Sequence, residues 1–222
     1  MAMLKRCPAL FVLCAFLALP LSYRADPPAN LDLAKDAVER YIASGLYGRE
    51  VTKVAVSANK YLAKRLAKPV KEGEKRAIIF DIDETAVTNL SHITAQDFGY
   101  IPAVWKRWVA EGQARAIVPV QQVYDLAVRN NVAVFFITGR KASDAAATEK
   151  NLREVGYSTW TKIYYAADDF QGSARLFKTG ARRAILNEGY TIVANIGDQQ
   201  SDLVGGMAER TFKLPNPFYL IK

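Results

Sequence analysis

The sequence predicts an α/β fold, in which a doubly wound, mainly parallel sheet carries helices on both faces. Three short apolar runs, at residues 77–80, 132–137 and 192–196, lack the alternation of half-exposed strands and are typical of strands covered on both faces. Helical patterns separate these runs, and strands that alternate with helices form parallel sheets. The 222 residues are 50% hydrophobic and 23% charged, which indicates one globular domain with a modest insertion and excludes disordered and coiled-coil proteins.

Residues 1–25 are predicted to be a secretory signal peptide. Two basic residues precede an apolar stretch at residues 9–19, which is shorter than the roughly 20 residues of a membrane span. We therefore expect a secreted or periplasmic protein with no stable membrane association after cleavage; the alternative is an uncleaved N-terminal anchor. Because Cys7 and Cys14 are the only cysteines, the cleaved chain would have neither a disulfide nor a cysteine nucleophile.

Residues 26–75 are predicted to form an N-terminal segment of two helices. Asn30 is suited to cap the first helix, because its side chain can accept a hydrogen bond from a free amide of the first turn. Ser44 and Gly45 interrupt the helical pattern. It resumes at Val51 and ends before a Lys-Pro pair.

The region after the first strand, at about residues 86–118, breaks the alternation of strands and helices. It contains Tyr100, Trp105 and Trp108 but little strand character. We expect a small, mostly helical insertion that lies as a cap over the edge of the sheet.

Helices and weaker strands complete the predicted alternation. Helices are expected over about residues 119–129, 144–155 and 174–188, and weaker strand patterns lie at residues 163–165 and 211–214. Ser143 is suited to cap the second of these helices, and Gly156 is suited to end it.

Polar residues follow the strongly predicted strands at the points where they end. They are Asp81 and Asp83, then Thr138 and Arg140, then Asp198 and Asp202. Ligands of an open parallel sheet bind beyond the carboxyl ends of its strands, so these side chains should converge. Four carboxylates repel one another without a cation, and a chain with a single histidine favours oxygen ligation of Mg²⁺. Since Mg²⁺ pairs naturally with phosphate, the expected substrate is a phosphate ester.

The spacing of Asp81 and Asp83 allows two arrangements. Both side chains share one face if the strand continues, whereas a turn at Ile82 separates them. In the second arrangement one carboxylate faces the metal and the phosphorus, while the other reaches the leaving group. Nucleophilic and acid–base catalysis require such a division of tasks.

The order of these motifs resembles that of the haloacid-dehalogenase (HAD) superfamily. The motifs are Asp81-x-Asp83-x-Thr85, then Thr138, then a lysine on a later helix, then Gly197-Asp198-x-x-x-Asp202. The variants Phe-Asp-Ile-Asp-Glu-Thr, Phe-Phe-Ile-Thr-Gly-Arg and Asn-Ile-Gly-Asp-Gln-Gln-Ser-Asp are similar to the class B, or subfamily IIIB, acid phosphatases, which include plant acid phosphatases and vegetative storage proteins. The resemblance covers about residues 30–222 and implies that residues 76–222 form a HAD-like catalytic core.

The resemblance also implies roles for the acidic residues. Asp81 would attack phosphorus and become an aspartyl phosphate. Asp83 would protonate the leaving oxygen and then activate the water that hydrolyses this intermediate. Mg²⁺ would be held by Asp81, the backbone carbonyl of Asp83 and Asp198, with support from Asp202.

The remaining candidates concern the phosphoryl group and the substrate. By the same resemblance, Thr138 and Lys178 would bind the phosphoryl oxygens, and Lys178 would share with Mg²⁺ the neutralisation of their charge. Arg140 would either orient the aspartates or contact the substrate. Trp105 packs the cap or, alternatively, stacks the leaving group. His92 is expected to be a polar surface residue.

The predicted function is that of a secreted or periplasmic, Mg²⁺-dependent acid phosphatase that hydrolyses small phosphate monoesters through a phospho-aspartate. A non-catalytic storage or binding protein of the same fold, and a phosphotransferase with an alcohol acceptor, are the alternatives. Removal of residues 1–25 reduces the net charge from +8 to +5, and no basic stripe with interleaved aromatic residues is present, so nucleic acid is not an expected partner. The sequence is compatible with a homodimer.

Overall fold

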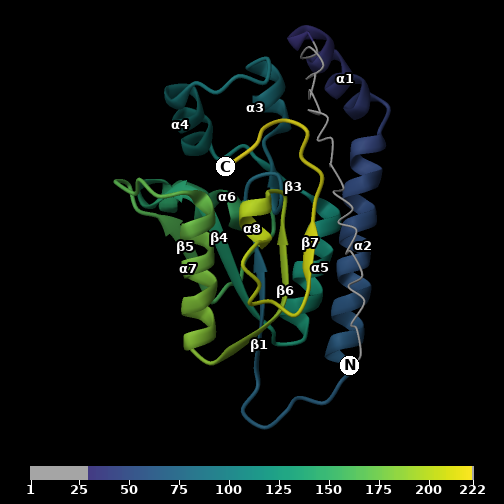
Figure 1. Ribbon diagram of the computed structural model, residues 1–222, viewed down its shortest axis with the longest axis vertical. Helices are drawn as coiled ribbons and strands as arrows, with labels where there is room; N and C mark the ends of the chain where they lie inside the picture. Colours follow the sequence, from purple (N-terminus) through teal and green to yellow (C-terminus); the bar gives the residue numbers. More distant parts are fainter. Residues whose placement is uncertain (1–29, 222) are drawn as a thin grey trace, which may run out of the picture.

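The computed structural model describes residues 30–221, so the predicted signal peptide lies outside the described residues. At its centre is a five-stranded parallel sheet in the order β5-β4-β1-β6-β7 (Figure 1). Its strands are β1 (Lys75–Phe80), β4 (Ala133–Lys141), β5 (Lys162–Ala166), β6 (Tyr190–Gly197) and β7 (Thr211–Lys213). From the central β1 the chain adds two strands on one side and then two on the other, which confirms the predicted doubly wound α/β fold.

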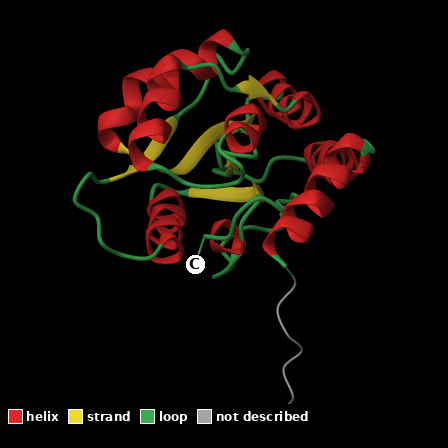
Figure 2. Cartoon of the chain, turned by 90° about the horizontal axis from the view of Figure 1, so that it is seen from above, coloured by secondary structure: helices red, strands yellow, loops and turns green. Residues whose placement is uncertain are grey.

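Helices cover both faces of this sheet (Figure 2). Side chains alternate along β1, so that Ile78 and Phe80 face one layer while Ala77 and Ile79 face the other. The first layer contains α2 (Leu46–Leu66), α5 (Val118–Arg129) and α6 (Ala145–Glu154), and the second contains α7 (Ala174–Asn187). Because both faces are covered, the central stretches of β1, β4 and β6 are apolar without alternation.

The first N-terminal helix, α1 (Leu31–Ala43), begins as predicted. The side-chain oxygen of Asn30 accepts hydrogen bonds from two amides of the first turn, at 3.0 and 3.3 Å. The chain then turns at Gly45, whose φ of +71° is a left-handed conformation that glycine adopts without steric cost.

The second N-terminal helix, α2, is an integral part of the core. It begins at Leu46, ahead of the apolar pattern that starts at Val51. Its first turn is exposed apart from Tyr47, so no apolar pattern marks this start. Ala55 and Leu62 are completely covered where the helix packs over the sheet and against α5. Within residues 30–221, no helix has both the length and the apolar character needed to cross a bilayer.

The segment that follows β1 is a helical insertion, in agreement with the prediction. It comprises β2 (Val87–Thr88), α3 (Leu90–Ala95), α4 (Pro102–Glu111) and β3 (Arg115–Ala116). The two short strands pair with each other in antiparallel fashion, and the helices lie beyond the carboxyl ends of the sheet strands (Figure 1). The insertion therefore lies next to the edge at which the candidate site residues meet.

The start of α6 differs from the prediction. Ser143 does not cap the helix but lies in a short 3-10 turn, η1 (Ala142–Asp144), and its amide and hydroxyl donate to Asp168 Oδ1 at 3.1 and 2.7 Å. The loop after β5 supplies this carboxylate, which is distant in sequence. The end of α6 agrees with the prediction, because Gly156 has a φ of +99°.

Candidate active site

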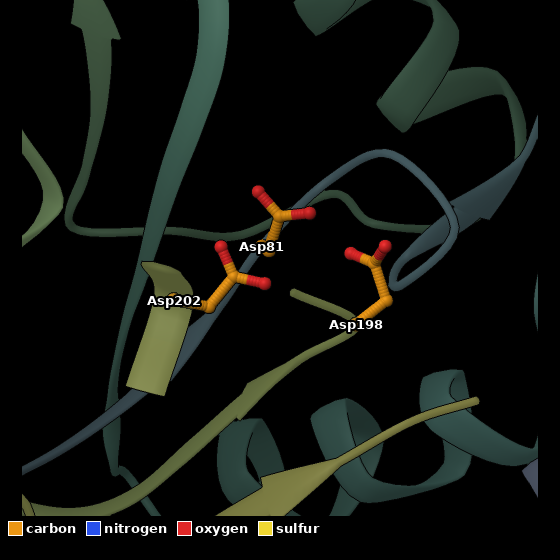
Figure 3. A group of neighbouring side chains, drawn as sticks. All are labelled: Asp81, Asp198 and Asp202. Atoms are coloured by element: carbon orange, nitrogen blue, oxygen red, sulfur yellow. The ribbon is translucent and has the colours of Figure 1, made fainter. Parts of the chain in front are cut away.

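Three acidic side chains meet at the carboxyl end of the sheet (Figure 3). Asp81 follows β1, Asp198 follows β6, and Asp202 lies in the short helix α8 (Gln200–Leu203). All three are buried, and each offers a carboxylate oxygen that lies within 4.8 Å of the others. They converge because β1 and β6 are neighbouring parallel strands that end at the same edge.

The approach of Asp202 to β6 depends on Gly197. A Cβ atom at position 197 would lie 2.4 Å from the Cβ of Asp202 and 2.4 Å from its Oδ2, closer than non-bonded atoms can approach. The Asp202 carboxylate also accepts a hydrogen bond from the amide of Gln199 at 2.7 Å. Asp202 therefore stabilises the first turn of α8 and belongs to the acidic cluster at the same time.

Lys178 places its buried ammonium group among these carboxylates from α7. Its Nζ donates to Asp81 Oδ1 at 2.6 Å and to a carboxylate oxygen of Asp202. Burial alone would lower the pKa of Lys178, but the two carboxylates outweigh it and raise the pKa above its ordinary value. The lysine therefore remains a cation within the site.

When its three carboxylates are ionised, the acidic cluster carries more negative charge than Lys178 balances. Burial raises the pKa of Asp81 well above its ordinary value; Lys178 opposes this rise, whereas Asp202 and Asp198 add to it. Burial, followed by the charge of Asp202, also raises the pKa of Asp198. Three buried carboxylates and one ammonium group fit a further cation, and an all-oxygen donor set suits Mg²⁺.

The side chain of Asp83 lies apart from this cluster. The amides of residues 85–87 donate to the carbonyl of Ile82, so the chain turns after Asp81 and the two aspartates are separated. The guanidinium of Arg140 donates to both oxygens of Asp83, at 2.7 Å from Nη2 and 3.1 Å from Nε. Of the two arrangements that the sequence allows, the structure has the one in which a turn separates Asp81 from Asp83. Three carboxylates come together, and Asp83 pairs with Arg140.

Arg140 and Asn89 determine the ionisation of Asp83. The Asn89 amide donates to Asp83 Oδ1 at 2.9 Å, and Arg140 is itself held by a hydrogen bond to Thr148 Oγ1 at 3.1 Å. Burial would raise the pKa of Asp83, but Arg140 and then Asn89 outweigh it and hold the pKa below its ordinary value. Asp83 is therefore a carboxylate in this arrangement.

Thr138 is completely buried on β4, the strand beside β1. Its hydroxyl accepts a hydrogen bond from the amide of Arg140 at 3.1 Å. The strand continues to Lys141, so the Thr-Gly-Arg sequence belongs to the strand itself. Gly139 is exposed, and a Cβ atom there would meet nothing within 4 Å. The backbone next to Thr138 therefore borders open space.

Three aromatic rings gather on the insertion. The ring centroid of His92 lies 5.3 Å from that of Trp108 and 5.5 Å from that of Trp105. His92 is half-buried against these rings, so it is not the polar surface residue that was predicted. Burial lowers its pKa. Trp105 is also half-buried, and its ring lies 5.7 Å from Cζ of Arg140.

Glu84 is a buried member of the site that sequence reasoning did not identify. It accepts hydrogen bonds from the Asn89 side chain and from the Tyr219 hydroxyl, both at 3.0 Å. Burial, followed by the charge of Asp83, raises the pKa of Glu84 to about 7. Trp108 Nε1 donates to Asn89 Oδ1 at 2.8 Å, so this network links the insertion to the site.

Asn216 was also missed, and it touches the acidic cluster directly. Its side-chain amide donates to Asp198 Oδ2 at 2.6 Å, while the Thr85 hydroxyl donates to Asp198 Oδ1 at 3.2 Å. Thr85 belongs to the first motif, but Asn216 lies after the last strand, where no periodic pattern marks it. In that region only the family resemblance, which extends to residue 222, gave a signal.

Comparisons with known proteins identify relatives of this chain. Residues 25–222 match the HAD superfamily, subfamily IIIB (acid phosphatase). The chain is 35% identical over 193 residues to acid phosphatase 1 of Solanum lycopersicum, covering 84% of this chain and 74% of that one. It is 27% identical over 198 residues to vegetative storage protein 1 of Arabidopsis thaliana, covering 87% and 72% of the two chains.

Solved structures share the fold. The class C acid phosphatase from Bacillus anthracis superposes with a TM-score of 0.72 at 24% identity, covering 86% of each chain. A structure of that enzyme with tungstate bound superposes with a TM-score of 0.70, also at 24% identity and 86% coverage of each chain.

Proposed function

Because this chain belongs to subfamily IIIB of the HAD superfamily, the acid phosphatases, we propose that it hydrolyses small phosphate monoesters with Mg²⁺ and through a phospho-aspartate on Asp81. The observation that carries this proposal is the buried cluster of Asp81, Asp198 and Asp202 in contact with Lys178. In this arrangement a nucleophile, metal ligands and a cation that binds phosphoryl oxygens lie at one edge of the sheet.

Asp81 is the proposed nucleophile and Asp83 its acid–base partner. One oxygen of Asp81 bonds to phosphorus while the bond from phosphorus to the ester oxygen breaks, and Asp83 gives a proton to the departing oxygen. Water then attacks the phosphorus, Asp83 takes a proton from it, and the bond to Asp81 breaks to release phosphate. The turn at Ile82, which separates the two carboxylates, supports this division of tasks.

In this proposal two residues bind the phosphoryl group, and a separate set of ligands binds the metal. Lys178 neutralises charge on the transferring group, and Thr138 donates a hydrogen bond to its oxygens. Asp198 and Asp202 complete the ligand set that Asp81 begins, together with the carbonyl of Asp83. Bound Mg²⁺ supplies positive charge that favours the ionised form of the nucleophile and offsets charge on the phosphoryl oxygens.

The lowered pKa of Asp83 supports activity at acidic pH. Since Arg140 and Asn89 keep Asp83 ionised, the protonated form that the first step needs becomes more populated as the pH falls.

The structural relative with tungstate bound supports an oxyanion site in this fold, because tungstate, like phosphate, is a tetrahedral oxyanion.

We further propose how the chain is processed and what it binds. Residues 1–25 act as a signal peptide, and the secreted or periplasmic protein comprises a helical segment of residues 26–75 and a catalytic core of residues 76–222. The basic n-region and short apolar stretch of the leader support this assignment. The substrate is a small soluble ester, and the half-exposed Trp105 ring beside Arg140 offers a surface for its leaving group.

Release of p-nitrophenol from p-nitrophenyl phosphate by residues 26–222 tests the reaction. The rate is measured between about pH 4.5 and pH 8, a range that brackets carboxylate and neutral catalysis, with Mg²⁺ or with EDTA. We expect turnover with Mg²⁺ and its loss in EDTA and in Asp81→Asn. The matched control is Asp169→Asn, an exposed aspartate, which should keep full activity.

Two results would count against the proposal. Turnover that survives Asp81→Asn would mean that another group is the nucleophile. A folded protein without turnover under any of these conditions would favour the storage or binding alternative. A phosphorylated alcohol formed in the presence of glycerol would instead identify a phosphotransferase.

A further inference from the structure

The last described residues, 214–221, form an irregular segment that passes along the carboxyl edge of the sheet towards the insertion (Figure 1). The segment starts with a hydrogen bond from the Leu214 amide to the Gly197 carbonyl at 2.9 Å, next to the acidic cluster. Phe218 anchors it: the ring is buried, with its centroid 5.1 Å from Tyr47 on α2 and 6.5 Å from Phe98 of the insertion. The segment is therefore attached to the hydrophobic core independently of the carboxylates.

The orientation of the Asn216 side chain follows from this anchoring. Its Oδ1 accepts hydrogen bonds from the amides of Phe218 at 2.8 Å and Tyr219 at 3.4 Å, as in an Asx-type turn. With the oxygen used in this way, the NH₂ group faces the other side and donates to Asp198 Oδ2 at 2.6 Å. Prolines on both sides of Asn216 further restrict the backbone.

The two oxygens of Asp198 have different environments. Oδ2 accepts from Asn216 and from Gln199 Nε2, at 2.6 and 2.7 Å, whereas Oδ1 accepts, within residues 30–221, only the longer 3.2 Å bond from Thr85. The C-terminal segment also holds Gln199, because the amide of Ile221 donates to its Oε1 at 3.0 Å. These contacts restrict rotation of the carboxylate and leave lone pairs of Oδ1 available. Figure 3 shows one oxygen of Asp198 turned towards Asp81.

We propose that Asn216 is a positioning residue for the metal: it orients the Asp198 carboxylate so that a divalent cation can bind between Asp198 and Asp81. The segment of residues 214–221 is thereby part of the metal site, although it follows the last strand and the acidic motifs. This inference rests on the proposed function, which places Mg²⁺ at this cluster. Hydrogen-bond partners that orient a ligand change metal affinity without touching the metal.

Isothermal titration of the intact protein with Mg²⁺ tests the inference without relying on turnover. In Asn216→Ala we expect the Kd for Mg²⁺ to rise about ten- to a hundredfold, as is usual when such a partner is removed. Asn216→Ser keeps an oxygen that can accept from the amides of the turn but is too short to donate to Asp198, and it should show a similar rise. The matched control is Asn130→Ala. The exposed Asn130 side chain caps the end of a distant helix, so the Kd of this variant for Mg²⁺ should stay unchanged.

The outcomes separate the inference from the proposed function. A wild-type protein that binds no Mg²⁺ contradicts the metal site itself. Wild-type binding together with an unchanged Kd in Asn216→Ser, with native circular dichroism, overturns the role of Asn216. Failure of Asn216→Ser to fold also overturns it, because Asn216 would then serve the fold and not the orientation of Asp198.

Discussion

Gly197 marks the point where β6 reaches the acidic cluster, and the space that a side chain would need there is occupied by Asp202. The contact involves the Cβ of Asp202, which is tied to the backbone of α8, so a rotation of the carboxylate alone does not relieve it. A larger residue at this position would therefore displace α8 together with its aspartate.

We expect Gly197→Ala to lower the free energy of unfolding by about 1–3 kcal/mol, the usual cost of overpacking, and to abolish turnover because Asp202 is displaced. The matched control is Gly180→Ala on α7, where a Cβ atom meets nothing within 4 Å. Alanine in the interior of a helix should make that variant up to about 1 kcal/mol more stable, with activity retained. Urea denaturation and p-nitrophenyl phosphate turnover measure both effects. Full activity in Gly197→Ala would contradict the close packing.

At the scale of elements, an ion-pair network joins the end of α2 to the start of β1. Glu74 lies between two arginines: it pairs with Arg65 through one oxygen and with Arg76 Nε at 3.1 Å through the other. Arg65 also pairs with Glu209, which precedes β7, at 2.8 Å. Hydrogen bonding to Arg65 is the largest influence on Glu74, and it holds the pKa of Glu74 at about 2, below the ordinary 4.5.

This shift predicts how stability depends on pH. A carboxyl group whose pKa is lowered in the folded state stabilises that state above its ordinary pKa, and the contribution is lost as the pH falls through the folded pKa. We therefore expect Glu74→Gln to lower Tm at pH 7, and the difference from wild type to shrink between pH 4.5 and pH 2. The control is Glu72→Gln, an exposed neighbour, which should change Tm little at any pH. A Tm difference that is constant over this range would contradict the assignment.

At the scale of the whole molecule, one hydrophobic cluster connects regions that are far apart in sequence. It includes α2, β1 and α5, the Ile93 side chain of the insertion and Phe218 of the C-terminal segment. The N-terminal helices and the cap are thus not separate from the catalytic core in their packing. Stability should therefore depend on residues of α2 as strongly as on residues of the sheet.

Two leucines of the N-terminal helices test this dependence. Leu62 on α2 is fully buried, whereas Leu33 on α1 is 64% exposed. We expect Leu62→Ala to lower the free energy of unfolding by about 2–5 kcal/mol, and Leu33→Ala to change it by less than about 0.5 kcal/mol. Urea denaturation measures both. Equal effects of the two substitutions would mean that α2 contributes no more to the core than α1 does.

Several features of the fold follow from residues that are neighbours in the sequence. Unalternated apolar runs indicated strands buried on both faces, the Asn30 cap and Gly156 indicated helix ends, and short motifs after the strands indicated acidic residues at one edge. These predictions succeed because hydrophobic periodicity and helix capping are properties of a short stretch of chain.

The tertiary structure alone shows which side chains meet. It separated Asp83 from the other carboxylates through Arg140, gave Ser143 to Asp168 instead of its own helix, and brought Asn216 to Asp198. Each of these contacts joins residues at least 18 positions apart, across loops that carry no periodic pattern. Their geometry depends on how the sheet, the insertion and the C-terminal segment pack together, because a hydrogen bond requires atoms to meet at about 3 Å and a local pattern does not specify such a distance.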